Sequence, residues 1–157
     1  MSRLLLFTLI GDGFHSFFYI FGVAEEIVLD HIQAGKSFDI YYHLNLDKLD
    51  CQVAIIKNAK SKKMGKKDII KIEGDVLDII DLKVLGYIDH NITINIIKDS
   101  KIVKKLSLKL PQEIKNIIHC KNPRCITSIE QELPHIFYLS DPEKEIYRCL
   151  YCEEKHS

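Results

Sequence analysis

The sequence predicts an α+β protein: an antiparallel sheet with two helices, followed by a small all-β domain built around four cysteines. Up to Pro111, short runs with the two-residue apolar period of strands alternate with two segments of helical period. After Pro111, four of the five cysteines lie in two clusters. A chain of 157 residues is long enough for one ordinary domain or for two small ones.

The part before Pro111 is expected to hold its elements in the order βαββαββ. The strands are expected at residues 17–32, 52–60, 66–74, 91–97 and 101–110, and the helices at 34–47 and 75–86. Because the connections between them are short, we expect an open antiparallel sheet with both helices on one face, a ferredoxin-like arrangement.

Apolar spacing and capping residues define the two helices. The buried face of the first is expected to consist of Phe38, Tyr41, Tyr42 and Leu46. The second is expected to be capped by Asp75 and to end near Gly86.

The apolar N-terminus resembles the start of a signal peptide, since the basic Arg3 precedes it. However, Asp12 and His15 interrupt it, and the unbroken run Leu4–Ile10 is shorter than the roughly 20 residues that cross a bilayer. We therefore favour a cytoplasmic protein with no membrane segment over an exported one. Residues 1–16 are expected to be a disordered extension or to lie outside the fold.

Composition and motifs narrow the range of possible functions. The chain has 22 basic and 22 acidic residues, so its net charge predicts no general attraction to polyanions. A local positive patch exists, because residues 57–71 hold seven lysines and a single acid, Asp68. No glycine-rich phosphate loop, nucleophile with a base, or open metal site is evident, so the sequence does not predict an enzyme.

The cysteine spacing is Cys120-x4-Cys125, then 23 residues, then Cys149-x2-Cys152. Two such pairs can place four thiolates around one structural Zn²⁺, which would stabilise a tail too small to fold on its core alone. Lys121, Arg124 and Arg148 could offset the negative charge, and His119, His135 or His156 could replace a ligand. Two disulfides, or cysteines that are merely buried, are the alternatives. Cys51 stands alone and is expected to be a small buried hydrophobe.

Three segments make the sequence similar to a known family: VLDHIQAG, KKMGKKDIIKIEG, and CKNPRCITSIEQ followed by YRCLYCE. In this order and at these separations they resemble the regulatory chain of aspartate carbamoyltransferase. The resemblance implies a non-catalytic chain with a nucleotide-binding allosteric domain, residues 17–111, and a zinc-binding domain, residues 112–157. It also implies regulatory dimers that bridge trimers of catalytic chains in a dodecamer, and control by ATP, CTP and often UTP.

The nucleotide site that the resemblance implies comprises Asp30, His31, Lys67, Lys71, Asn95 and Lys105. Lysines can bind a triphosphate as point charges, Asp30 can accept hydrogen bonds from ribose hydroxyls, and Asn95 can donate and accept. Taken without the resemblance, Lys71 could be an outward-facing surface residue and His31 a core or surface histidine. Glu26 stands where the family usually has glycine, which leaves base selectivity open, and residues 1–16 have no counterpart.

The rival function is a zinc-ribbon protein that binds nucleic acid, because cysteine pairs and a lysine-rich hairpin also suit that role. Charge argues against it. Residues 113–157 contain six Lys plus Arg and eight Asp plus Glu, so the cysteine region is slightly acidic. No nucleic-acid partner is therefore expected.

Overall fold

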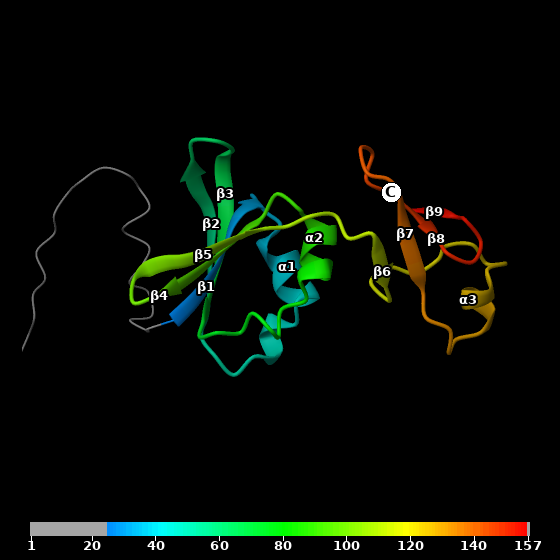
Figure 1. Cartoon of the computed structure of the whole chain (residues 1–157), viewed down its shortest axis with the longest axis horizontal. Helices are drawn as coiled ribbons and strands as arrows, with labels where there is room; N and C mark the ends of the chain where they lie inside the picture. Colours follow the sequence, from blue (N-terminus) through cyan, green and yellow to red (C-terminus); the bar gives the residue numbers. More distant parts are fainter. Residues whose placement is uncertain (1–24, 157) are drawn as a thin grey trace, which may run out of the picture.

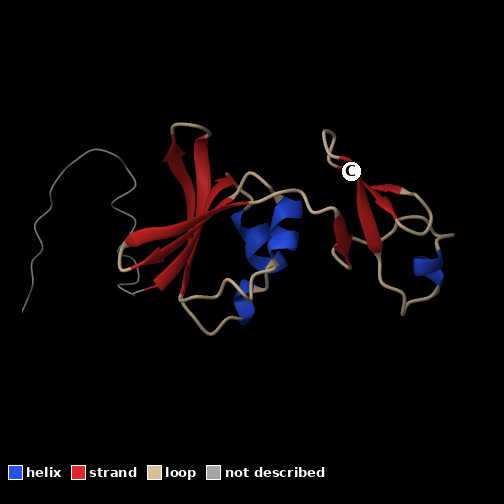
Figure 2. Cartoon of the chain, in the orientation of Figure 1, coloured by secondary structure: helices blue, strands red, loops and turns tan. Residues whose placement is uncertain are grey.

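The computed structural model describes residues 25–156, which form two units, each with its own sheet (Figures 1 and 2). The five-stranded unit contains β1 (Glu25–Gln33), α1 (Ser37–His43), the 3-10 turn η2 (Leu46–Lys48), β2 (Val53–Ser61), β3 (Gly65–Glu73), α2 (Leu82–Ile88), β4 (Thr93–Lys98) and β5 (Lys101–Ser107). The four-stranded unit contains β6 (Glu113–Lys115), α3 (Ile126–Ile129), β7 (Ile136–Asp141), β8 (Ile146–Cys149) and β9 (Lys155–His156). The expected extension 1–16 and the first half of the expected first strand lie outside the described residues.

The first sheet has the strand order β2-β3-β1-β4-β5, and all its neighbouring strands are antiparallel. Both α1 and α2 lie on one face of this sheet, on the side of the four-stranded unit (Figure 1). Alternate residues of the central strands, such as Ile27, Leu29, Ile70 and Ile72, pack there against the helices. The expected α+β class is confirmed, with the β-α-β-β-α-β arrangement extended by one strand.

The expected start of α2 at Asp75 is wrong. The helix is capped by Asp81, whose carboxylate accepts hydrogen bonds from the backbone N–H groups of Lys83 and Val84. It also continues past Gly86 to Ile88. Gly86 therefore lies inside the helix. The position needs a glycine because the chain leading to β6 passes close to it: a Cβ there would lie 2.6 Å from the carbonyl oxygen of Lys109.

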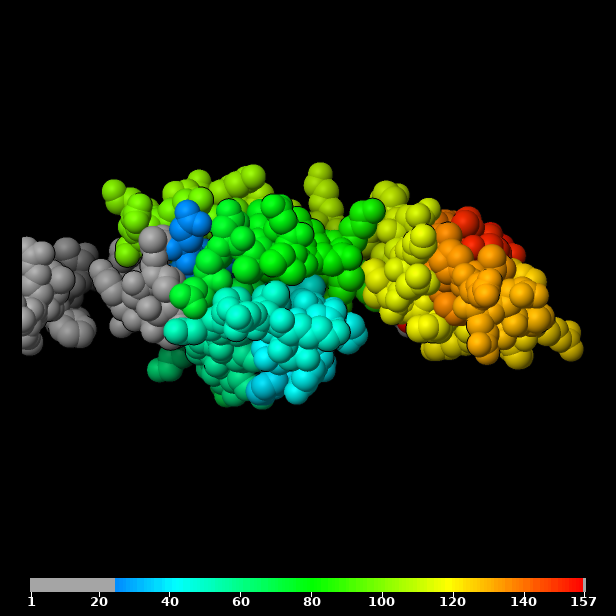
Figure 3. All heavy atoms as spheres, turned by 90° about the horizontal axis from the view of Figure 1, so that it is seen from below, coloured from blue at the N-terminus to red at the C-terminus, as the bar shows by residue number. Residues whose placement is uncertain are grey.

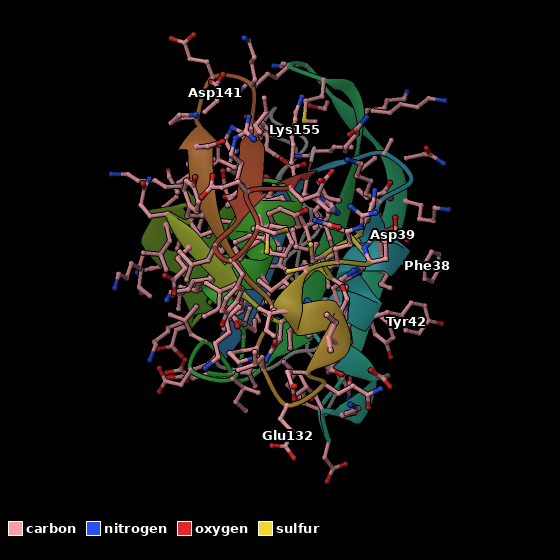
Figure 4. The ribbon with its side chains drawn as sticks, turned by 90° about the vertical axis from the view of Figure 1, so that its right-hand side faces the viewer. Phe38, Asp39, Tyr42, Glu132, Asp141 and Lys155 are labelled. Carbon is pink, nitrogen blue, oxygen red and sulfur yellow. The ribbon has the colours of Figure 1, made fainter. Side chains whose placement is uncertain are left out.

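The expected buried face of the first helix is also wrong in part. Phe38 and Tyr42 are 46% and 65% exposed and point away from the fold (Figure 4). The buried residues of this short helix are Ser37 and Ile40. Ser37 is held in place because its hydroxyl donates to Asp68, 2.7 Å away. Tertiary contacts at the start of the helix therefore decide which side faces the core.

The second sheet has the order β6-β7-β8-β9, again antiparallel. Its core is small and consists of Ile114, Cys125, Phe137, Tyr147 and Cys149. The one-turn helix α3 follows Cys125 directly and was not predicted. A small, mainly β domain around the cysteines is confirmed.

The two units touch through Tyr87 of α2. Its ring packs edge-on against Tyr147 of β8, with 5.2 Å between the centroids, and its hydroxyl lies 3.4 Å from Nδ1 of His156. The hydroxyl of Tyr147 donates to the carbonyl of Pro111 over 2.8 Å. In the space-filling view the green surface that includes α2 meets the yellow segment that leads into β6 (Figure 3). Within residues 25–156, no helix has the length and apolar character needed to span a bilayer.

Candidate functional site

The four cysteines of the four-stranded unit converge on one point. Their Sγ atoms all lie within 4.8 Å of one another, with 3.5 Å between Cys120 and Cys152 and 3.7 Å between Cys125 and Cys149. A tetrahedral ion with metal–sulfur bonds of about 2.3 Å holds its sulfurs about 3.8 Å apart, so these thiols fit one metal ion. All the cysteines are free, so the disulfide alternative is wrong.

The thiols differ in how readily they ionise. Burial raises the pKa of Cys120 to about 12. At Cys125 burial also acts to raise the pKa, but hydrogen bonds from Thr127 help to bring it down to about 7. The hydroxyl oxygen of Thr127 lies 3.2 Å from the Cys125 sulfur. Since four adjacent thiolates repel one another, a cation is needed to keep all four deprotonated.

Short turns hold the second pair of cysteines. The backbone N–H of Cys149 donates to the carbonyl of Glu154, and the N–H of Glu153 donates back to Cys149, each over 2.9 Å. The guanidinium of Arg148 donates to the Glu153 carbonyl over 3.0 Å, so this residue holds the turn that carries Cys152. His135 accepts from the backbone N–H of Cys120 over 3.3 Å. The cysteines thus form a closed set of four ligands.

A second cluster lies on the face of the five-stranded sheet that points away from the helices. We call it the charged sheet face and define it as Glu26, Val28, Asp30, Lys67, Ile69, Lys71, Asn95, Ile97 and Lys105. Strand register pairs Val28 with Lys71 on one side and with Asn95 on the other, and Asn95 with Lys105. Residues from four neighbouring strands therefore form one row across the sheet.

One end of this face is organised by Asp30. Its Oδ1 atom lies 2.6 Å from the ammonium of Lys67 and accepts the backbone N–H of His31 over 2.7 Å. Its Oδ2 atom lies 3.3 Å from Nδ1 of His31, without making a hydrogen bond. The register of β1 with β3 shifts between Leu29 and Ile32, which is where Asp30 and His31 lie, and His31 has a φ of 64° there.

The pKa of His31 reflects its burial and the charged groups around it. Burial is the largest cause that lowers the pKa of His31, and the carboxylate of Asp30 opposes it. The positive charges of Lys67, Lys105 and Lys63 lower this pKa further. Lys105 is exposed on β5, and its charge nevertheless acts at the Asp30 end of the face.

The other end holds a buried ion pair that sequence reasoning missed. Lys71 is only 2% exposed, and its ammonium lies 3.5 Å from Oε1 of Glu26, which is 4% exposed. Burial lowers the pKa of Lys71, and Glu26 opposes this effect. Lys71 is therefore not the outward-facing surface residue that remained an alternative. Strand alternation from Asp30 to Val28 to Glu26 was the signal that could have placed Glu26 on this face.

Asn95 lies beside this ion pair in the row. It is 2% exposed, and its Oδ1 atom is buried with no hydrogen-bond partner among the described residues. A buried acceptor without a partner costs free energy and is available to a ligand that donates a hydrogen bond. The structure thus brings together Asp30, His31 and Lys67 by contact, and aligns Lys71, Asn95 and Lys105 by register.

Comparisons with known proteins agree over nearly the whole chain. The family model described as aspartate carbamoyltransferase regulatory chain, allosteric domain, matches residues 19–109, and the one described as the metal binding domain of the same chain matches residues 112–157. The aspartate carbamoyltransferase regulatory chain of Clostridium tetani is 53% identical over 135 residues, which cover 86% of this chain and 93% of that protein.

Two further relatives carry the same name. The protein of Clostridium acetobutylicum is 54% identical over 132 residues, covering 84% of this chain and 89% of the relative. That of Bifidobacterium longum is 41% identical over 133 residues, covering 85% and 94%. The resemblance inferred from the sequence motifs is confirmed, and the chain belongs to the family of aspartate carbamoyltransferase regulatory chains, which are non-catalytic subunits.

Proposed function

We propose that this chain binds nucleoside triphosphates, ATP and CTP, on the charged sheet face and transmits their effect to the catalytic chain of an aspartate carbamoyltransferase in pyrimidine biosynthesis. The observation that carries the proposal is that this face holds two buried ion pairs. Asp30 with Lys67 and Glu26 with Lys71 lie at its two ends. Buried charges are costly to maintain, and clusters of them are typical of functional sites.

Four residues of the charged sheet face, together with the adjoining His31, have roles in nucleotide binding that their chemistry supports. Lys67 and Lys105 supply positive charge for the phosphates as point charges, and the imidazole of His31 can donate a hydrogen bond to them. Asp30 accepts hydrogen bonds from ribose hydroxyls, and the unpartnered Oδ1 of Asn95 accepts a donor of the nucleotide. The nucleotide thereby binds a face that the helices do not cover.

We propose further that the ion at the four cysteines is one structural Zn²⁺ per chain. Four thiolates are a ligand set that suits zinc and leaves no position for water, so the ion stabilises the fold and performs no chemistry. Free thiols stay reduced in the cytoplasm, where we place the protein. The domain division at Pro111 is supported by the two family matches, one ending at residue 109 and the other starting at 112.

The zinc domain is the proposed docking site for the catalytic chain. Four large apolar side chains near the cysteines are between 39% and 63% exposed: Ile126, Ile129, Leu150 and Tyr151. The first two belong to α3, at the end of the molecule that faces the viewer in Figure 4. Exposed large apolar side chains such as these are candidates for contact with a partner protein. In the assembly that we propose, regulatory dimers bridge catalytic trimers in a dodecamer.

The contact through Tyr87 connects the domain of the proposed nucleotide site with the proposed docking domain. The helix α2 packs on the sheet that carries the nucleotide site, and Tyr87 of that helix packs on Tyr147 of the zinc domain. The close approach at Gly86 ties the same helix to the connecting chain. A shift of α2 on nucleotide binding would therefore move the docking domain.

The test compares lysine variants with a cysteine variant. Lys71→Ala and Lys105→Ala should each weaken nucleotide binding, because a charge-assisted contact contributes roughly 1.5 to 3 kcal/mol, about a tenfold to hundredfold change in affinity. Both should still assemble with the catalytic chain and keep its basal turnover, while the response to ATP and CTP fades. Cys149→Ala should instead lose assembly. Calorimetry measures the affinity, and sedimentation measures the complex.

Lys104→Ala is the matched control, because Lys104 is the exposed neighbour of Lys105 on β5 and pairs in register with Ile96 instead of Asn95. It should bind nucleotide like the parent chain. Normal binding by Lys71→Ala and Lys105→Ala would show that the site lies elsewhere. If these two variants instead lost affinity for DNA or RNA that the parent bound tightly, the nucleic-acid function would replace this proposal.

A further inference from the structure

A cavity of about 390 Å³ lies between the two units, and we call it the junction cavity. The first unit lines it with the end of β1, the β2–β3 turn and the end of α2, and the second unit lines it with the β7–β8 turn. Both turns lie at the top of the view in Figure 1. Cavities of this volume at domain junctions are typical of sites for small ligands. The titratable residues that line it are His31, Lys36, Lys63, Asp89, His90 and Glu145.

One side of the junction cavity is basic. Lys36 lies in the turn after β1, where its backbone N–H donates to the carbonyl of Gln33 over 3.0 Å. Burial is the largest cause that lowers the pKa of His31, and the charge of Lys63 lowers it further, so Lys63 lies near the end of β1. Both lysines are exposed, and neither forms an ion pair with a carboxylate among residues 25–156. Their positive charges are therefore available to an anionic group.

The other side of the junction cavity is acidic. Asp89 follows α2, and its Oδ1 atom accepts hydrogen bonds from the backbone and side-chain N–H groups of Asn91 over 2.9 and 3.2 Å. The Oε1 atom of Glu145, in the β7–β8 turn, lies 3.7 Å from Nδ1 of His90, which is too far for a hydrogen bond. A carboxylate has about four acceptor positions. Both carboxylates can therefore accept further hydrogen bonds from a cationic group.

Two lysines on one side and two carboxylates on the other exclude ligands of a single charge. A lone anion at the lysines would be repelled by Asp89 and Glu145, and a lone cation at the carboxylates would be repelled by the lysines. A ligand that carries both charges, one at each end, is attracted by both sides.

We propose that the junction cavity binds a small zwitterion of the amino-acid class, with its anionic group at Lys36 and Lys63 and its ammonium group at Asp89 and Glu145. Because Glu145 belongs to the second unit and the other three residues to the first, the ligand bridges the two units. The inference goes beyond nucleotide binding and does not depend on it, since the cavity shares only His31 with the proposed nucleotide site.

The experiment titrates the full chain, with its metal bound, with ω-amino acids of increasing length, from β-alanine through 4-aminobutyrate to 6-aminohexanoate. Amide shifts of the ¹⁵N-labelled protein at Lys63 and Asn91 report occupation of the cavity and give the affinity. At least one ω-amino acid should bind saturably. It should bind about threefold to fivefold more tightly than the carboxylic acid or the amine of the same chain length, the change expected for ion pairs that stay in contact with water.

Two variants separate the ends of the ligand. Lys63→Gln should weaken binding of the ω-amino acid about threefold to fivefold without weakening binding of the amine. Glu145→Gln should weaken it by a similar factor without weakening binding of the carboxylic acid. Lys60→Gln and Glu143→Gln are the controls, because these exposed residues lie close by in the sequence but do not line the cavity, and both should bind like the parent chain.

Three outcomes would overturn the proposal. One is the absence of saturable binding by every member of the series. Another is binding of the carboxylic acid, or of inorganic phosphate, as tightly as the ω-amino acid, which would show a site for anions only. The third is an unchanged affinity in both Lys63→Gln and Glu145→Gln, which would place the ligand outside the junction cavity.

Discussion

The two units of this chain are stabilised in different ways. Twelve buried apolar side chains, from one sheet face, the helices and the segments next to them, form the core of the five-stranded unit. The core of the four-stranded unit has five buried residues, and two of these are the cysteines Cys125 and Cys149. The first unit can fold by burying apolar surface, whereas the second has a much smaller core, so we expect it to need a bound metal to fold. The proposed nucleotide site and the proposed docking surface thus lie on parts that differ in what stabilises them.

The largest effect is expected from removing a metal ligand. Cys149→Ser should abolish tight metal binding, which contributes about 10–16 kcal/mol in small zinc domains, and should unfold the four-stranded unit. The five-stranded unit should keep its fold. Hydrogen exchange followed by mass spectrometry would show lost amide protection in β7 and β8 with protection retained in β1 and β3.

The control for this prediction is Cys51→Ser, because Cys51 packs at the edge of the larger core and lies outside the metal centre. Both units should stay protected in that variant. Loss of protection in the two units together, after Cys149→Ser, would mean that they fold as one and that the comparison is wrong.

An intermediate effect is expected at Asp68, which is fully buried in the five-stranded unit. Its carboxylate accepts hydrogen bonds from the backbone of Gly35 and Asn58, each over 2.9 Å, and from the Ser37 hydroxyl. Asp68→Ala leaves these donors unpaired and should lower the free energy of unfolding by about 2–4 kcal/mol. Urea unfolding measures it, with the exposed Asp39→Ala as a control that should change stability by less than about 0.5 kcal/mol.

The same carboxylate should make this unit sensitive to acid. Burial acts to raise the pKa of Asp68, but the hydrogen bonds from Asn58, Ser37 and Gly35 outweigh it and hold the pKa below its usual value. Its contribution is therefore present above about pH 4, the pKa in an unfolded chain, and is lost as the pH falls through the lower folded value. Asp68→Asn should remove that part of the pH dependence. An unchanged acid profile in this variant would contradict the assignment.

The smallest effect is expected at the start of α2. Asp81→Ala removes the cap that accepts from Lys83 and Val84 and should cost about 1 kcal/mol. Asp75→Ala, at an exposed position outside the helix, should cost less than about 0.5 kcal/mol. Thermal unfolding of the two variants compares them directly. Equal losses would show that Asp81 does not act as the cap in solution.

Asp75 and Asp81 illustrate the limit of predicting a helix start from local sequence. Both residues precede apolar runs of roughly helical period, so either could cap a helix. In the structure the intervening segment turns and buries Ile80 in the core, and the helix begins only after Asp81. The same holds for Phe38 and Tyr42: their spacing fits a buried stripe, but the contact of Ser37 with Asp68 orients the helix differently.

The sequence by itself determined the metal centre, the strand order along the chain and the family. Cysteine pairs a few residues apart converge through single turns, and strand alternation is local, so both can be read from spacing. Only the tertiary structure decided that Glu26 meets Lys71, that Asp30 meets Lys67, and that Tyr87 meets Tyr147. These contacts join residues on separate elements, and they depend on strand register, on a bulge in β1 and on the packing of α2, which no local pattern specifies.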